Sequence, residues 1–284
     1  SEAPVSVPPT ERVRGANGSL LQRLNAKAVR KVIFNAPPKR TQYPRFLLGT
    51  WTTIQSFSGF ELLAPESGGK ISKRDVIATP EVPGFQVLSI AAFADIGTNP
   101  KSPYLLRFTD AVGDSSGYWC VKDEQFCFSQ SLNAQLQGLD ASKSEADVVD
   151  SIEYSGAQNP NRISIALRPG AVRNAERIEL FRNGAETERP VASAGWFLVR
   201  EQWRQVALGY STSYGRARTI ATDYAHVWGF RPRAGVDAHS PPTAVDAFCC
   251  TFAYANERQT PALFDAAGTA PLAIFQHRFE LRKT

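Results

Sequence analysis

From position 46 onward, apolar residues fall in short runs rich in β-branched and aromatic side chains, separated by clusters of Gly, Pro, Asn and Asp. This composition and punctuation are typical of β-strands. We therefore predict a mainly β chain with strands at residues 47–57, 85–95, 104–109, 118–128, 149–155, 163–167, 177–182, 197–210, 218–228, 248–254 and 274–281.

The strands are expected to be antiparallel and to close into a barrel. About ten strands without alternating helices favour a barrel or a sandwich, and long strands that follow one another as a meander favour the barrel. Asn183-Gly184 is a strong signal for a hairpin turn. A helix is indicated within the barrel region only at 132–149.

The N-terminal segment has a different pattern. Between positions 18 and 34, apolar residues recur mostly at spacings of three and four, with basic residues between them, as in an amphipathic helix. Ser19 is a candidate N-cap, and Pro37-Pro38 would end the helix. We therefore divide the chain into an N-terminal basic helical arm, residues 1–45, and a single barrel domain, residues 46–284.

Positive charge is concentrated in this arm. Residues 1–45 carry nine Lys or Arg against Glu2 and Glu11, a net +7, whereas the whole chain of 284 residues is +5, which leaves −2 on the barrel. The arm is either a solvated tail or a docking element for an anionic partner, namely an acidic protein face or a membrane surface. Nucleic acid is disfavoured because the barrel is acidic and has no nucleic-acid motif. The candidate partner-binding residues are Arg23, Lys27, Arg30, Lys31, Lys39 and Arg40.

The cysteines leave two alternatives open. Their spacing does not fit a zinc site, so they form either disulfides or buried free thiols. The first two could close a short loop, whereas two adjacent cysteines on a strand would point to opposite faces. The four residues are Cys120, Cys127, Cys249 and Cys250.

No catalytic constellation or cofactor site is evident. Ser115 stands in a G-x-S-x-G sequence, but residues 118–120 continue as a strand, so a β-hairpin loop is favoured over a nucleophile elbow, which requires a following helix. His226, His239 and His277 lack the spacing of metal ligands. We therefore expect a binding protein rather than an enzyme, with no cofactor.

Three short features resemble the signature of lipocalins. They are a G-x-W, a T-D-Y and an arginine that packs over the tryptophan, and they imply a lipocalin-like (calycin-type) β-barrel; the alternative is ordinary strand composition. A barrel of this kind could carry a pigment or lipid, or act as a chromophore lyase. The residues are Gly49, Trp51, Thr222, Asp223, Tyr224 and Arg278.

A second resemblance covers roughly residues 40–284. Residues 43–51, 148–154 and 222–224 resemble an uncharacterised family of cyanobacterial and plastid proteins sent to the thylakoid lumen. Within it, the chain is most similar to green-algal auxiliary factors of photosystem II assembly or repair. The resemblance implies a non-catalytic chloroplast protein, peripheral to the membrane, that docks on photosystem II core subunits at their lumenal face. Because Ser1 rather than Met begins the chain, we also expect a transit peptide to have been removed.

Overall fold

The computed structural model describes residues 18–32, 40–64, 71–82, 100, 102–111, 113–114, 117–137, 147–172, 175–189, 195–211, 216–233 and 241–284. The predicted strand at 85–95 lies outside these residues, as do Lys39, Ser115 and His239.

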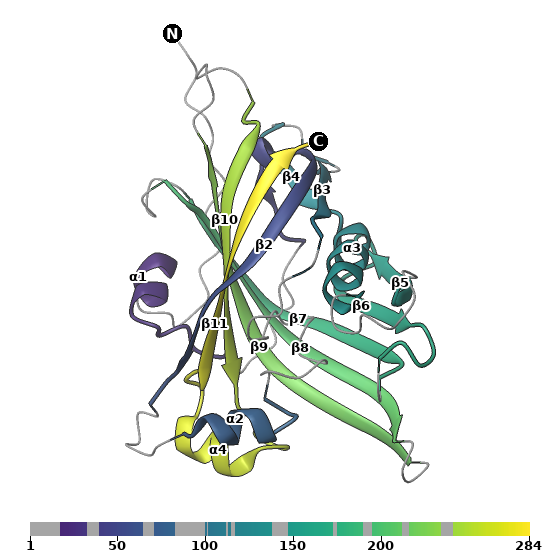
Figure 1. The fold of residues 1–284 in the computed structure, drawn as a ribbon. Helices are drawn as coiled ribbons and strands as arrows, with labels where there is room; N and C mark the ends of the chain where they lie inside the picture. The colour runs from purple at the N-terminus through teal and green to yellow at the C-terminus, as the bar shows by residue number, and fades with distance from the viewer. Residues whose placement is uncertain are drawn as a thin grey trace.

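The described chain is mainly β and forms one antiparallel sheet (Figure 1). The strand order is β1-β4-β3-β2-β11-β10-β9-β8-β7-β6-β5, so β5 to β11 form a continuous meander, as predicted. The strands are β1 (Tyr43–Pro44), β2 (Gly49–Leu62), β3 (Tyr104–Asp110), β4 (Trp119–Lys122), β5 (Val149–Ser155), β6 (Asn159–Leu167), β7 (Arg177–Glu188), β8 (Phe197–Ser211), β9 (Arg216–Pro232), β10 (Ala244–Tyr254) and β11 (Ala273–Lys283).

The sheet curls into a half-barrel. Among the described residues, β1 and β5 are the two edges, and no ladder joins them. This curled antiparallel sheet fits the predicted β-barrel. The meander pattern fixes which strands follow one another but carries no information on whether the first and last strands meet.

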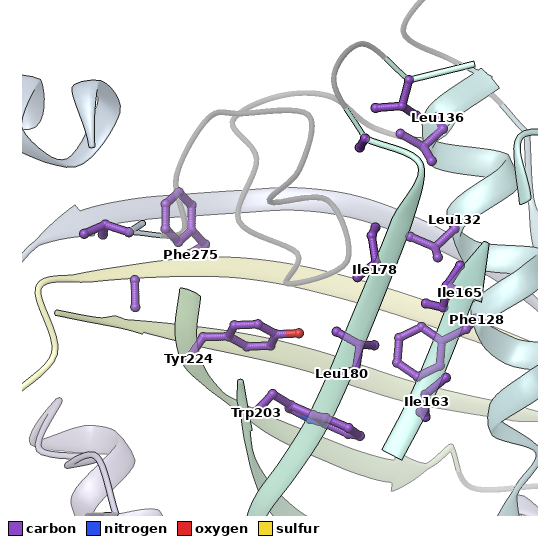
Figure 2. Packing of buried hydrophobic residues seen from close by; sticks show 14 of the residues in the cluster. Phe128, Leu132, Leu136, Ile163, Ile165, Ile178, Leu180, Trp203, Tyr224 and Phe275 are labelled. Atoms are coloured by element: carbon purple, nitrogen blue, oxygen red, sulfur yellow. The ribbon is translucent and has the colours of Figure 1, made fainter. Parts of the chain in front are cut away.

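Helices lie against both faces of the sheet. On what we call the inner face, Figure 2 shows Phe128 and Leu132 of α3 beside Ile165 of β6 in one hydrophobic cluster. On the outer face, Leu20 of α1 is buried with Leu198 and Phe252. The helices are α1 (Leu20–Asn25), the 3-10 helix η1 (Arg45–Leu47), α2 (Lys73–Ala78), α3 (Glu124–Gln137) and α4 (Pro261–Ala267).

Two predicted boundaries are wrong because local capping was overlooked. The strand predicted at 118–128 ends at Lys122, and α3 begins at Glu124. Asp123 caps this helix, since its carboxylate accepts a hydrogen bond from the Phe126 N–H at 3.1 Å. The helix predicted at 132–149 accordingly begins earlier, and β5 begins at Val149.

The predicted hairpin turn is also wrong. Asn183 and Gly184 lie inside β7, where the register with β8 shifts between Arg182 and Gly184. A glycine within a strand often marks such a bulge.

Candidate functional site

The basic N-terminal residues form a strap over the outer face; we use this name for residues 18–32. The predicted helix at 18–34 is only partly present, because α1 ends at Asn25 and Lys27 follows in a left-handed conformation, φ 55°. Ser19 is the N-cap, as predicted, and forms a capping box with Gln22. Beyond α1, side chains of the sheet supply several of the strap's hydrogen bonds.

Polar side chains on the sheet hold the strap backbone. Gln202 accepts from the Val32 N–H at 2.6 Å and donates to the Val32 carbonyl at 2.9 Å. The Tyr254 hydroxyl donates to the Val29 carbonyl at 2.7 Å. Leu20 and Val29 are fully buried, so the strap completes a core on the outer face of the sheet.

The predicted partner-binding residues bond to their own chain. Arg23 pairs with Glu186 at 2.5 Å and Lys31 with Asp223 at 2.7 Å, both buried. The other three described residues contact the chain as well: Lys27 pairs with Glu61 in a half-exposed site, Arg30 lies beside Thr269, and Arg40 donates to the Lys122 carbonyl. Three of the five described candidates, Arg23, Lys27 and Lys31, are therefore paired with carboxylates of the same molecule, which the charge count did not indicate.

Asp223, in the predicted T-D-Y feature, anchors the strap. Its carboxylate is 1% exposed and accepts hydrogen bonds from Lys31, Arg204 and Asn256. Burial by itself raises the pKa of this carboxyl, but the effect of Arg204 and Lys31, which lower the pKa, is larger. The pKa of Asp223 is therefore below its usual value. Asp223 is therefore held ionised as a structural residue.

The structure separates the other signature residues. Trp51 is fully buried, and the cation above its ring is Lys283, whose Nζ lies 4.5 Å from the ring centroid. Arg278 instead lies exposed on the outer face, opposite Ser56 of β2 and Phe248 of β10. Tyr224 belongs to a different hydrophobic cluster from Trp51. The placement of Arg278 over the tryptophan is therefore wrong, although the cation–π geometry itself occurs.

A polar belt crosses the inner face between two hydrophobic clusters. On β9, for example, His226 stands between Tyr224 of one cluster and Trp228 of the other. Glu201 pairs across the strands with His226, and His226 with Thr251. The buried belt consists of Gln55, His277, Thr251, His226, Glu201 and Arg182.

Charges in this belt are paired. The Arg182 guanidinium lies 2.5 Å from Glu201 and 3.6 Å from Glu124, and Glu124 pairs with Lys122 at 3.0 Å. Burial raises the pKa of Glu201, but Arg182 and Lys122 lower it more, so the net pKa is lowered. Two cations and two carboxylates give an electrically neutral cluster, which is the condition for burying charge at tolerable cost.

Beside the belt lies a small cavity between the sheet and α3. Aromatic side chains such as Tyr104 and Trp228 line it, together with Lys122, Glu201 and His226. Its volume of about 30 Å³ admits a water molecule or two. In the described ranges, His, Cys, Asp and Glu side chains do not gather in threes where a metal ion could bind.

All four cysteines are free thiols, so the possible disulfides are not formed. Cys249 and Cys250 point to opposite faces of β10 and join different clusters, as predicted for neighbours on a strand. Cys120 donates to the backbone carbonyls of Tyr43 and Pro44 rather than approaching a second sulfur. The sequence had left this outcome open.

Ser115 of the G-x-S-x-G sequence lies outside the described residues, but the strands on either side of it are described. The strands β3 and β4 on either side pair antiparallel, and Asp114 accepts a hydrogen bond from the Trp119 N–H at 2.9 Å. A nucleophile elbow instead joins a strand to a helix. The hairpin therefore gives no support to a hydrolase reading.

A groove on the outer face, which we call the outer groove, is much larger than the inner cavity. It has a volume of about 640 Å³ and lies over β2, β11, β10 and β9. Its apolar residues are Ile54, Trp196 and Phe248, whereas Arg231 and Arg278 supply positive charge. Sequence reasoning missed this site because its residues come from segments far apart in the chain, and those of them that it singled out, such as Arg278, were given different roles.

Aromatic packing shapes the floor of the groove. The Phe248 ring lies directly on Gly229, where an added Cβ would be 2.2 Å from the ring. Trp196 packs edge-on against Phe248 with centroids 5.0 Å apart, and the Arg231 guanidinium lies 4.4 Å from the Trp196 ring centroid. These contacts form an apolar floor with a cationic edge.

The chain matches no known family model, curated protein or solved structure. None of the helices in the described ranges has the length and apolar character that a membrane crossing requires.

Proposed function

We propose that this protein is a non-catalytic auxiliary factor that docks on the lumenal face of photosystem II during assembly or repair. The observation that carries the binding role is the outer groove, whose floor of Trp196 and Phe248 lies beside exposed Arg278. Aromatic and arginine side chains are the residues that most often dominate protein–protein binding. The choice of partner and of compartment rests on the resemblance of residues 43–51, 148–154 and 222–224 to the lumenal family.

The groove takes over the role first expected of the basic arm. Arg23 and Lys31 are engaged with Glu186 and Asp223, whereas Arg278 is exposed. Contact of the arm with a membrane surface remains part of the proposal only through charges such as Lys27, which is half-exposed.

A gradient experiment tests the docking function. The purified chain is incubated with detergent-solubilised thylakoid complexes at low and high salt and then sedimented. We expect co-migration with photosystem II cores that weakens as salt rises, because exposed charge pairs are screened. Protein that stays at the top of the gradient under both conditions contradicts the proposal.

The alternative is a lipocalin-like carrier or lyase for a pigment or lipid. The aromatic cavity between the sheet and α3 supports it, with Lys122 and Glu201 as polar contacts. However, the cavity volume of about 30 Å³ is far below the roughly 300–1,000 Å³ of small-molecule sites. An absorbance scan before and after addition of pigment tests this alternative, and uptake of pigment would favour it over docking.

A further inference from the structure

The outer groove has the features of a peptide site with mixed chemistry. Its volume of about 640 Å³ falls within the roughly 300–1,000 Å³ of ligand-binding clefts. Ile54 is 42% exposed at its wall, one of the few large apolar side chains at the described surface. Ser56 and Ser58 on the same face of β2 offer hydroxyl groups beside it.

The arginines of the groove differ in whether a carboxylate partners them. Arg233 is engaged with both Asp246 and Glu280, each at 2.7 Å. Among the described residues, the Arg278 side chain has no ion-pair or hydrogen-bond partner, and it is exposed. The groove therefore offers one uncompensated guanidinium beside an apolar floor.

These observations point to the chemistry of the occupant. We propose that the outer groove binds an acidic segment of a partner protein, with a carboxylate on Arg278 and an apolar side chain on the Phe248–Trp196 floor. This inference deepens the proposed docking function and rests on it. Arginine suits this role because its planar guanidinium can hold a carboxylate through two parallel hydrogen bonds.

An anionic membrane fits the groove less well. Membrane surfaces are recognised by clusters of about four to eight cations, whereas the three arginines lining this groove stand among Asp246 and Glu280. Those two carboxylates would repel lipid phosphates. A peptide can place its charges and its apolar side chain individually, so it can avoid them.

Fluorescence anisotropy with a labelled synthetic peptide tests the proposal. The probe carries acidic residues on both sides of one Phe, and a matched peptide has Lys at the acidic positions. We expect the acidic peptide to bind and the basic one not to bind, with the Kd raised about tenfold by Arg278→Glu. Arg258→Glu is the control, because it makes the same charge change at an exposed position outside the groove.

The outcomes distinguish a failure of the peptide-site proposal from a failure of the proposed photosystem II partner. Absence of acidic-peptide binding, equal affinity for both peptides, or an unchanged Kd in Arg278→Glu overturns the peptide site, as does tighter binding to phosphatidylglycerol vesicles than to the peptide. Peptide binding without co-migration on photosystem II retains the groove and rejects the partner. Co-migration that persists in Arg278→Glu retains the partner and rejects the groove.

Discussion

Arg182 on β7 and Glu201 on β8 form an ion pair of 2.5 Å on the inner face of the sheet, with side chains 1% and 2% exposed. Thr41 hydrogen-bonds to both partners, at 3.0 Å and 2.8 Å, and so ties the segment before β1 to the middle of the sheet. The pair therefore joins two strands and a segment about 140 residues away in sequence.

Replacing only one partner of this ion pair should destabilise the fold. Arg182→Met leaves the Glu201 carboxylate buried beside Glu124 with one cation fewer, and we expect it to lower the free energy of unfolding by about 3–5 kcal/mol. Urea denaturation measures the loss. The double variant Arg182→Met with Glu201→Leu should recover a large part of it, because no uncompensated charge remains at Glu201. Losses that simply add in the double variant contradict this account.

The strap should depend on its buried ion pair and not on its exposed one. Lys31→Ala leaves the buried Asp223 with fewer partners, so we expect a loss of about 2–3 kcal/mol. The matched variant Lys27→Ala removes a half-exposed pair and should cost less than about 1 kcal/mol. Thermal unfolding compares the two, and amide hydrogen exchange should show faster opening of residues 18–32 only in Lys31→Ala. Equal effects of the two variants would argue against an anchored strap.

Stability should fall in acid. The pKa values of Glu201 and Asp223 are lowered in the folded protein by neighbouring cations that outweigh burial. A carboxylate whose pKa is lowered in the folded state contributes its full stabilisation of the fold above the unfolded pKa of about 4. That contribution is lost as the pH falls through the folded pKa. We expect a nearly constant urea midpoint between about pH 5 and 8, followed by a steep decline below about pH 4. Asp223→Asn should be less stable at neutral pH and decline less steeply; a midpoint that rises on acidification contradicts the assignment.

The thiols should be unreactive while the protein is folded. Burial raises the pKa values of Cys120, Cys127 and Cys250 to about 12, so only about one thiol in ten thousand is ionised at pH 8. We expect iodoacetamide to label none of the four cysteines in the native protein and all four in urea. Mass spectrometry counts the labelled cysteines in the native and in the unfolded protein. If the cysteines stay unlabelled in urea until the protein is reduced, they form disulfides.

The Phe248 ring should leave room only for a glycine at position 229. An alanine Cβ would collide with this ring at 2.2 Å, so we expect Gly229→Ala to cost about 1–3 kcal/mol and to weaken binding of the acidic peptide. In a Phe248→Ala background the same change should be nearly neutral for stability. An equal cost in both backgrounds would mean that the ring is not the obstacle.

The sequence by itself determined the strand content and the meander, because strand propensity and turn punctuation are local properties. Nine of the predicted strand regions overlap the nine strands from β3 to β11. The opposite facing of Cys249 and Cys250 followed from the alternation of side chains along a strand.

Only the tertiary structure decided which positive charges are available to a partner. Arg23 and Lys31 look free in the sequence, but folding brings them to carboxylates more than 160 residues away, whereas Arg278 has no carboxylate partner in the part of the chain that the structure describes. The outer groove arises in the same way, from residues on four strands whose adjacency no local pattern encodes. Ion pairing depends on distances of a few ångströms between atoms, and strand order and curvature set those distances.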